Sequence, residues 1–272
     1  MNSRGPKLLA VGDCCVDEYE GECSFPGGNA LNVAAAWKRR GADSSFMGAV
    51  GDDEAGSWLL KEIEAAGLDP SHTTKISGRT GLTEIRLDRE GERQIVAERF
   101  GVSEDFAVGA EESEAFGDVD WVHGALSPTA QDLIEAFRAE GRGLSFDFST
   151  NLVTSGLDGL DVAFYSWEGQ PSPETDAVLE SALQAGASVA VAMCGRYGSR
   201  AATAEQRVSL DGNEIDVVDT CGAGDAYIAS FIVSRLNGAG LEESMRAGRS
   251  AGEETCLTLG AWLNHRTARV AK

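Results

Sequence analysis

The chain has 272 residues, of which 42% are hydrophobic, so it can bury a full-sized core as one large domain or two small ones. Its formal net charge is −21, and such a surface repels nucleic acid and anionic membranes over roughly 8 Å in physiological salt. No apolar run approaches the roughly 20 residues of a membrane helix, and charge arrives at Asp13, so we expect a cytoplasmic protein with neither nucleic-acid nor membrane partners.

Strands and helices alternate in the first part of the chain. A short apolar run over 7–13 ends in Gly-Asp and predicts a buried strand that opens into a loop. A helix is predicted over 27–41, where apolar residues recur at helical spacing and a glycine ends the pattern. A strand over 44–51 and a helix over 53–67 follow. This order is typical of parallel strands joined by helices.

The pattern changes between residues 83 and 99. The segment TEIRLD (83–88) alternates apolar and polar residues, REGE supplies a turn, and RQIVAER (93–99) follows. Alternation of this kind indicates an antiparallel hairpin with one wet face rather than a buried parallel strand. We interpret it as a small β flap added to the main body.

From residue 121 the strand–helix alternation resumes and runs to the last predicted helix. Strands are predicted at 121–126, 143–149, 161–166, 188–194 and 214–220, the last within a hairpin over 199–219, and helices at about 129–140, 172–186, 223–237 and 242–257. The fold class is therefore α/β, with a mostly parallel sheet covered on both faces. We expect one domain over 1–272 that carries the flap as an insertion.

A segment without bulky or basic side chains, DTCGAGD (219–225), begins one of these helices. Gly222, Ala223 and Gly224 cannot screen their N–H groups, so they form a cup for an anion at the helix N-terminus. In open α/β sheets, ligands bind at the carboxyl ends of the strands, where this segment is predicted to lie. Neither a Walker-type loop nor a G-x-G-x-x-G fingerprint is present.

Asp225 at this helix start has two interpretations. An acid in a first turn is favoured by the helix dipole by about 0.3–1 kcal/mol and needs no other function. Phosphoryl transfer gives the second interpretation, because it requires a charge-stabilising cup and a residue that orients the acceptor hydroxyl and takes its proton. Asp225 would then lie at the edge of the cup, with the alcohol between it and the phosphorus.

DTCGAGD resembles the signature of the ribokinase-like (PfkB) carbohydrate kinases. GDCCVD (12–17), PGGNALNVA (26–34) and CGRYGS (194–199) resemble other family segments in the same order. The resemblance implies a ribokinase-like three-layer sandwich with a mostly parallel central sheet and a small β lid, at about 17–26 and 72–100. It also implies an ATP-dependent carbohydrate kinase that uses Mg²⁺.

The resemblance implies a role for residues in each motif, with Asp13 added by its position beside the sugar pocket. The residues are Asp225, Gly222, Ala223 and Gly224 for catalysis; Asp17, Gly27, Gly28, Asn32 and Asp13 for the sugar; Gly195, Gly198 and Thr220 for ATP; and Asp219 and Gly260 for a monovalent cation such as K⁺. The N-x-x-E motif of many members is absent from FYSWEGQ, where Glu168 is a candidate for the magnesium shell. Asn32 could instead be an ordinary helix residue, and Gly27 and Gly28 only a turn.

Within the family, VGDCCVD, FDFS and LGAW resemble the fructoselysine 6-kinase branch. This implies a fructosamine acceptor phosphorylated at its 6-hydroxyl. The protonated amine of such a sugar would suit acids, here Asp13, Asp17 and Glu98. Solvated surface is an open alternative for Asp13 and the simpler interpretation for Glu98.

Other acceptors stay open, namely ribose, fructose, 2-keto-3-deoxygluconate or a nucleoside, as does a non-catalytic sugar or nucleotide sensor on the same fold. A homodimer through the exposed edges of the flap is a further candidate.

Overall fold

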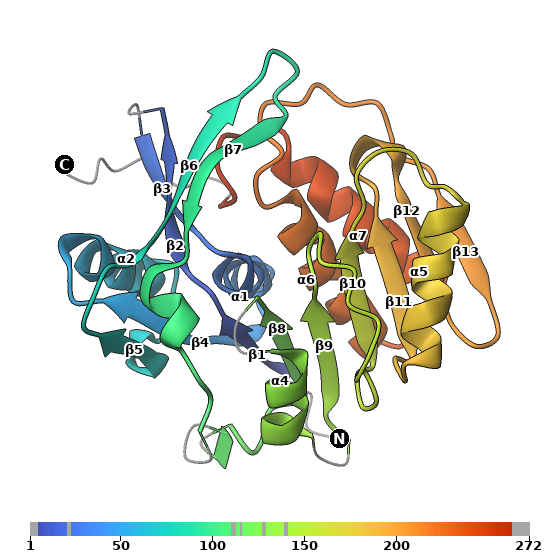
Figure 1. Ribbon diagram of the computed structural model, residues 1–272, viewed down its shortest axis with the longest axis horizontal. Coiled ribbons are helices and arrows are strands. Elements are labelled where there is room, and N and C mark those ends of the chain that lie inside the picture. The colour runs from blue at the N-terminus through green and yellow to red at the C-terminus, as the bar shows by residue number, and fades with distance from the viewer. Residues whose placement is uncertain are drawn as a thin grey trace.

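The computed structural model describes residues 5–20, 23–109, 113–114, 116–126, 129–138 and 141–262. The predicted single domain, the first lid segment and the helix over 129–140 each include residues outside these ranges. The described chain forms two β-sheets, a large one and a small one (Figure 1).

The large sheet has nine strands, and its middle is parallel. From one edge to the other the strands are β13 (Arg207–Leu210), β12 (Ser199–Ala202), β11 (Val189–Met193), β10 (Val162–Ser166), β9 (Gly143–Asp147), β8 (Trp121–Ala125), β1 (Lys7–Gly12), β4 (Asp43–Gly51) and β5 (Thr73–Ile76). All pairs from β11 to β5 are parallel, whereas β12 and β13 add an antiparallel hairpin. The predicted α/β class and mostly parallel sheet are confirmed.

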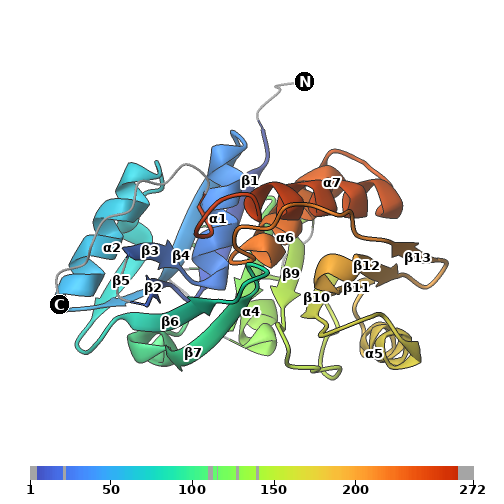
Figure 2. The ribbon, with the colours of Figure 1, turned by 90° about the horizontal axis from the view of Figure 1, so that it is seen from above.

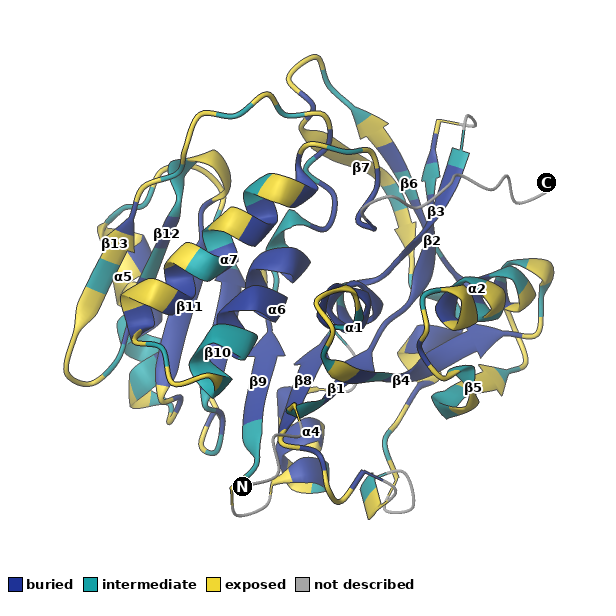
Figure 3. Ribbon diagram, turned by 180° about the vertical axis from the view of Figure 1, so that it is seen from behind, coloured by how far each residue is buried: buried dark blue, intermediate teal, exposed yellow. Residues whose placement is uncertain are grey.

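Helices cover both faces of this sheet (Figures 2 and 3). On one face lie α1 (Asn29–Arg39), α2 (Glu54–Ala65), α6 (Ala223–Leu236) and α7 (Leu241–Thr255), and on the other α4 (Ala130–Phe137) and α5 (Pro173–Gln184). Short 3₁₀ turns are η1 (Pro70–His72), η2 (Gly101–Asp105) and η3 (Gly195–Tyr197). Because both faces are covered, β8 and β11 are buried at every position, which explains their continuous apolar sequences. The three-layer arrangement is as predicted.

The small sheet is the lid. Its strands, in spatial order, are β3 (Cys23–Gly27), β2 (Cys15–Tyr19), β6 (Gly81–Leu87) and β7 (Arg93–Arg99). It rises beyond the carboxyl ends of the parallel strands (Figure 1). The lid was expected to resume at residue 72, but β5 at Thr73–Ile76 pairs with β4 in the large sheet. The chain therefore stays in the main body until it reaches β6.

The prediction of a strand over 214–220 is wrong. The amide of Val218 donates to the Cys256 carbonyl (2.8 Å), whereas the amide of Thr220 donates to the Gly91 carbonyl (3.2 Å). These partners lie in two different irregular segments, so no ladder forms. The segment instead packs between the lid turn and the end of α7.

Helices α1 and α6 are neighbours on the same face and are tied by a buried hydrogen bond. The Trp37 indole N–H donates to the Ala229 carbonyl (3.0 Å), and both residues are fully buried. This contact fixes the position of one helix along the other, which sets the relative positions of their N-terminal side chains. Among the described helices, none combines the length and the hydropathy that a bilayer crossing needs.

Candidate active site

The first turn of α6 presents its backbone to the carboxyl ends of the strands. Gly222 is the N-cap and has a left-handed φ of 73°; a side chain there would meet the Ala261 Cβ at 2.4 Å. The Ala223 amide makes a long hydrogen bond to the Thr220 carbonyl (3.3 Å). Within the described part of the chain, the amides of Gly222 and Gly224 have no hydrogen-bond partner, as expected of a helix start. These are the amides that the sequence predicts to form an anion cup.

Asp225 lies in the same turn and is only 7% exposed. Its Oδ2 accepts a hydrogen bond from the Asn32 Nδ2 (2.8 Å), and the Asn32 Oδ1 accepts one from the Trp262 indole N–H (2.9 Å). Because an indole N–H can only donate, it fixes the amide so that its NH₂ faces the carboxylate. The structure thus brings Asn32 from α1 and Asp225 from α6 together.

The pKa of Asp225 is raised to about 8, chiefly by burial. The hydrogen bond from Asn32 and the positive charge of Arg93 lower the pKa, whereas the negative charge of Asp147 raises it. A carboxyl whose pKa lies near neutral pH can both hold and release a proton there, which is what a general base requires.

Asp17 is the second predicted acid and is 4% exposed on β2. Its two oxygens accept hydrogen bonds from the thiols of Cys15 (3.3 Å) and Cys221 (3.5 Å), and burial raises its pKa to about 6. A side chain at Gly27 would overlap this carboxyl group at 2.3 Å. Gly27 is thus required for Asp17 to fit, and Cys221 connects Asp17 to the anion cup.

Asp13 is buried, 5% exposed, so the solvated-surface interpretation is wrong. Its oxygens accept hydrogen bonds from the backbone amides of Asn29 (2.9 Å) and Ala30 (3.2 Å) at the start of α1. Burial raises its pKa to about 7 despite these bonds. Gly28, with φ at 100°, makes the close approach possible, because a side chain there would meet the Cys14 Cα at 2.5 Å.

Asp147, at the end of β9, was not among the predicted site residues. It is 3% exposed, accepts hydrogen bonds from the Asn29 Nδ2 (3.2 Å) and the Ser149 amide (2.8 Å), and has its pKa raised to about 6 by burial. Its charge acts on both Asp13 and Asp225. The sequence could have indicated this residue, because Asp147 is an acid at the carboxyl end of an apolar strand, in the segment FDFS.

Arg93 was also missed, and it comes from the lid. Its backbone amide donates to the Thr220 hydroxyl (3.1 Å), and its Nη1 donates to the Cys221 sulfur (3.8 Å). Its charge lowers the pKa values of Asp17, Asp147 and Asp225. No sequence motif marks this residue, because its place depends on how the lid folds over α6.

The predicted nucleotide residues lie at the end of β11. Gly195 and Gly198 have φ values of 54° and 93°, and a side chain at Gly198 would meet the Leu210 carbonyl at 1.9 Å. Met193, the last residue of β11, would contact a Cβ at Gly224 at 3.7 Å, so this turn follows a strand end that adjoins the anion cup. Bare backbone at both places fits a bound triphosphate.

Thr220 was predicted to contact ATP, and in the structure its hydroxyl contacts the lid. Besides accepting from the Arg93 amide, it donates to the Glu92 Oε1 (3.0 Å). The turn between β6 and β7 is thereby held against the segment that leads into α6.

The predicted cation residues are in direct contact with each other. Asp219 is fully buried and accepts hydrogen bonds from the Tyr19 hydroxyl (2.7 Å), the Cys221 amide (2.9 Å) and the Gly260 amide (2.7 Å). Glu168 is exposed in the loop after β10. In the ranges that the structure describes, no three His, Cys, Asp or Glu side chains are grouped to hold a metal ion.

A family model for the pfkB family carbohydrate kinases matches residues 20–129 and 164–267. The chain belongs to this family. It is therefore an ATP-dependent sugar kinase, and the site at α6 is its candidate active site.

Two characterised relatives match this kinase over nearly its whole length. It is 32% identical over 264 residues to the fructoselysine 6-kinase of Escherichia coli, covering 94% of this chain and 99% of the relative. It is 30% identical over 267 residues to the fructosamine kinase FrlD of Bacillus subtilis, covering 94% and 93%. A putative ribokinase from Agrobacterium tumefaciens shares the fold, with a TM-score of 0.80, 21% identity and coverage of 95% and 94%.

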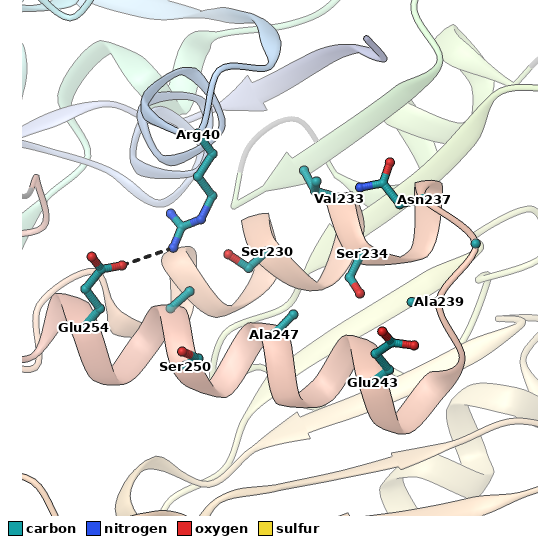
Figure 4. A pocket seen from close by; sticks show the side chains of 12 residues that line it. Arg40, Ser230, Val233, Ser234, Asn237, Ala239, Glu243, Ala247, Ser250 and Glu254 are labelled. Atoms are coloured by element: carbon teal, nitrogen blue, oxygen red, sulfur yellow. Dashed lines mark ion pairs between the residues drawn. The ribbon is translucent and has the colours of Figure 1, made fainter. Parts of the chain in front are cut away.

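The kinase also has a groove between α6 and α7, away from this constellation (Figure 4). Arg40 reaches across it to form an ion pair with Glu254 (3.5 Å), and small side chains such as Ser230 and Ala247 line it. None of the predicted site residues lines this groove. The groove is therefore separate from the place where the carboxylates and the anion cup meet.

Proposed function

We propose that this kinase transfers the γ-phosphoryl group of ATP to the 6-hydroxyl of fructoselysine or a related fructosamine. The observation that carries the proposal is the buried Asp225, held by Asn32 beside the open amides of Gly222 and Gly224. The fructosamine acceptor is supported by the two relatives, which are named for fructoselysine and fructosamine and match 94% of the chain.

Each group of the site has one task in the proposed reaction. Asp17 and Asn32 hold the sugar so that its hydroxyl points at Asp225, and alignment near phosphorus supplies a large part of the rate acceleration. As the bond from the acceptor oxygen to the γ-phosphorus forms, the bond from phosphorus to the bridging oxygen of ADP breaks. Asp225 takes the hydroxyl proton, and the amides at the start of α6 stabilise the charge on the phosphoryl oxygens.

The nucleotide would lie over the turn at Gly195 and Gly198, with its terminal phosphate toward α6. Mg²⁺ bound to the phosphates neutralises part of their charge, and it draws most of its ligands from phosphate and water. This fits a protein without a grouped set of metal ligands in its described residues. Asp219 and the carbonyl of Gly260 stay the proposed contacts of a monovalent cation such as K⁺, and Glu168 the proposed contact of the magnesium shell.

Net charge in the site favours a cationic acceptor. Four carboxyls of the site are buried, those of Asp13, Asp17, Asp147 and Asp225, and the charge of the Arg93 guanidinium acts on the last three. A fructosamine brings a protonated amine, which stabilises ionised carboxylates nearby, whereas ribose, fructose and 2-keto-3-deoxygluconate bring no cation.

The test is an assay of ADP release across a substrate panel of fructoselysine, other fructosamines, ribose, fructose, 2-keto-3-deoxygluconate and adenosine. We expect kcat/KM for a fructosamine to exceed that for every neutral sugar by about 100-fold or more, since two well-placed charge contacts contribute at least 2–3 kcal/mol. The phosphate should be found on the 6-oxygen by NMR. A higher kcat/KM for any other acceptor of the panel would overturn the acceptor assignment, and thermal shifts with every ligand but no ADP release would favour a sensor.

We also propose that the lid edge pairs with a second copy of the chain. Ile95 and Val96 on β7 are 48% and 53% exposed, and adjacent apolar residues on an edge strand favour pairing. Light scattering should find a dimer that Val96→Lys converts to a monomer; a wild-type monomer would contradict this.

A further inference from the structure

Arg93 lies near several acids, and within the described residues its guanidinium forms no ion pair. The neighbouring lid arginines Arg86 and Arg99 are paired with Glu20 and Glu84. For the Arg93 guanidinium, in contrast, the described part of the chain supplies one side-chain partner, the Cys221 sulfur at 3.8 Å. A guanidinium has five N–H donors, so most of the donors of Arg93 are available to a ligand.

The backbone of Arg93 is held in place even though its side chain is not. Its amide donates to the Thr220 hydroxyl, and the carbonyl of Gly91, two residues earlier, accepts from the Thr220 amide (3.2 Å). Cys221, which the guanidinium touches, directly precedes the Gly222 cap of α6. The lid therefore places a positive charge at the entrance to the anion cup.

The surrounding charges explain why a phosphate site here needs this arginine. The acids whose charge interacts with the Arg93 guanidinium come from β2 (Asp17), β9 (Asp147) and α6 (Asp225). With so many acids, a site that must accept a triphosphate needs a cation, since phosphate and carboxylate repel each other. Planar guanidinium groups bind phosphoryl oxygens through two parallel hydrogen bonds.

We propose that Arg93 is a catalytic residue that the lid carries to the phosphoryl group in transfer. The guanidinium donates hydrogen bonds to the γ-phosphoryl oxygens while the bond to the acceptor forms and the bond to ADP breaks. It is charged before and after the step and exchanges no proton, since the hydroxyl proton goes to Asp225. The inference rests on the proposed function of Asp225, because it requires phosphoryl transfer at the start of α6.

The position of Arg93 on the lid has a second consequence, which concerns hydrolysis of ATP. Because the cation is attached to the lid, the complete charge set exists only when the turn at Gly91 contacts Thr220. While the lid is open, Arg93 would not stabilise transfer of the phosphoryl group to water. The same residue would therefore favour transfer to the sugar over hydrolysis.

The experiment compares Arg93→Gln and Arg93→Lys with Arg99→Gln, a control on the same strand whose guanidinium bonds to Glu84. Steady-state kinetics with the best sugar of the panel should show kcat lowered by about 10²–10³-fold for Arg93→Gln and less for Arg93→Lys, with KM for the sugar within about threefold. Arg99→Gln should stay within about threefold of wild type. Equal melting temperatures would establish that the variants fold.

Two readouts separate a catalytic arginine from a structural one. Added guanidine at millimolar concentration should restore part of kcat to Arg93→Ala and none to Asp225→Asn. Removing the positive charge of Arg93 should also move the acid limb of the plot of kcat/KM against pH to higher pH, because that charge lowers the pKa of Asp225.

The proposal is overturned if Arg93→Gln keeps wild-type kcat, or if it raises the sugar KM alone, since Arg93 would then only bind the sugar. In those cases an inactive Asp225→Asn would leave the proposed function standing. An active Asp225→Asn would remove the proposed function itself, whatever Arg93 does.

Discussion

Asp225 is held by a chain of two hydrogen bonds that joins α6, α1 and the segment after α7. The Trp262 indole N–H orients the Asn32 amide, and that amide donates to the carboxylate. Without the indole, the Asn32 amide could turn its oxygen toward Asp225, which would repel the ionised form. If Asp225 is the base, as we propose, Trp262 is a positioning residue for it.

We predict that Trp262→Phe lowers kcat by about 10-fold and shifts the acid limb of the kcat/KM profile to higher pH, because the bond from Asn32 lowers the pKa of Asp225. Trp58→Phe is the matched control, because the Trp58 indole N–H is buried without a hydrogen-bond partner in the described structure. Unchanged pH dependence in Trp262→Phe would show that the indole does not position the amide.

At the scale of elements, the lid turn contacts the segment before α6. Gly91 has a φ of 77°, and a side chain there would meet the carbonyl oxygens of Val217 and Val218 at 2.9 Å. Only glycine permits this approach, after which Thr220 can bond to the lid. The lid is thus attached to the loop that forms the anion cup.

We therefore predict that Gly91→Ala weakens lid closure. ATP hydrolysis without sugar should rise relative to sugar phosphorylation, because closure excludes water from the phosphoryl group. Gly41→Ala is the control, since Gly41 also has a positive φ, 81°, but its Cβ would meet no atom within 4 Å. Both substitutions place alanine at a positive φ, so both variants should lose a similar amount of folding stability from backbone strain. An equal ratio of ATP hydrolysis to sugar phosphorylation in the two variants would contradict a closing role for the turn.

At the scale of the whole molecule, the buried carboxyls of the site lower the stability of the fold when they are ionised. Burial on folding raises the pKa values of Asp13, Asp17, Asp147 and Asp225 to about 7, 6, 6 and 8, from the ordinary aspartate value of 3.8. The folded chain therefore binds more protons than the unfolded chain between about pH 4 and pH 8. The contribution of these groups to stability is fully present at low pH and is lost as the pH rises through the raised values.

The free energy of unfolding should accordingly fall between pH 5.5 and pH 9 by a few kcal/mol, on the order that linkage gives for shifts of this size. Asp225→Asn should reduce the slope and be more stable than wild type at pH 9, whereas Asp176→Asn, at an exposed ion pair, should not. Urea titrations at three pH values measure this. A wild-type free energy that rises with pH would contradict the assigned directions.

Local patterns predicted most of the large sheet, because parallel strands buried on both faces leave continuous apolar runs such as 188–194. The anion cup was equally visible, since its chemistry is contained in DTCGAGD. The segment 214–220 was misassigned because apolar residues report a packed environment and not a hydrogen-bonded neighbouring strand. In this chain that environment is the lid on one side and the end of α7 on the other.

The partners of Asp225 could not be predicted in the same way. Trp262 lies 230 residues from Asn32, and Asn32 lies 193 residues from Asp225, so only the packing of α1 against α6 brings them together. Arg93 is one of several lid arginines, and sequence does not show which of them turns toward the cup. For Asp147, the sequence indicated only that an acid stands at the end of an apolar strand.

The most direct test of the account is the turnover of Asp225→Asn with ligand binding measured on the same preparation. We predict that calorimetry finds both ATP and the sugar bound within about threefold of wild-type affinity, while kcat falls by about 10²–10⁴-fold, the share of a general base. Turnover near that of wild type would contradict the central claim, because the carboxylate at the start of α6 would then have no part in the transfer.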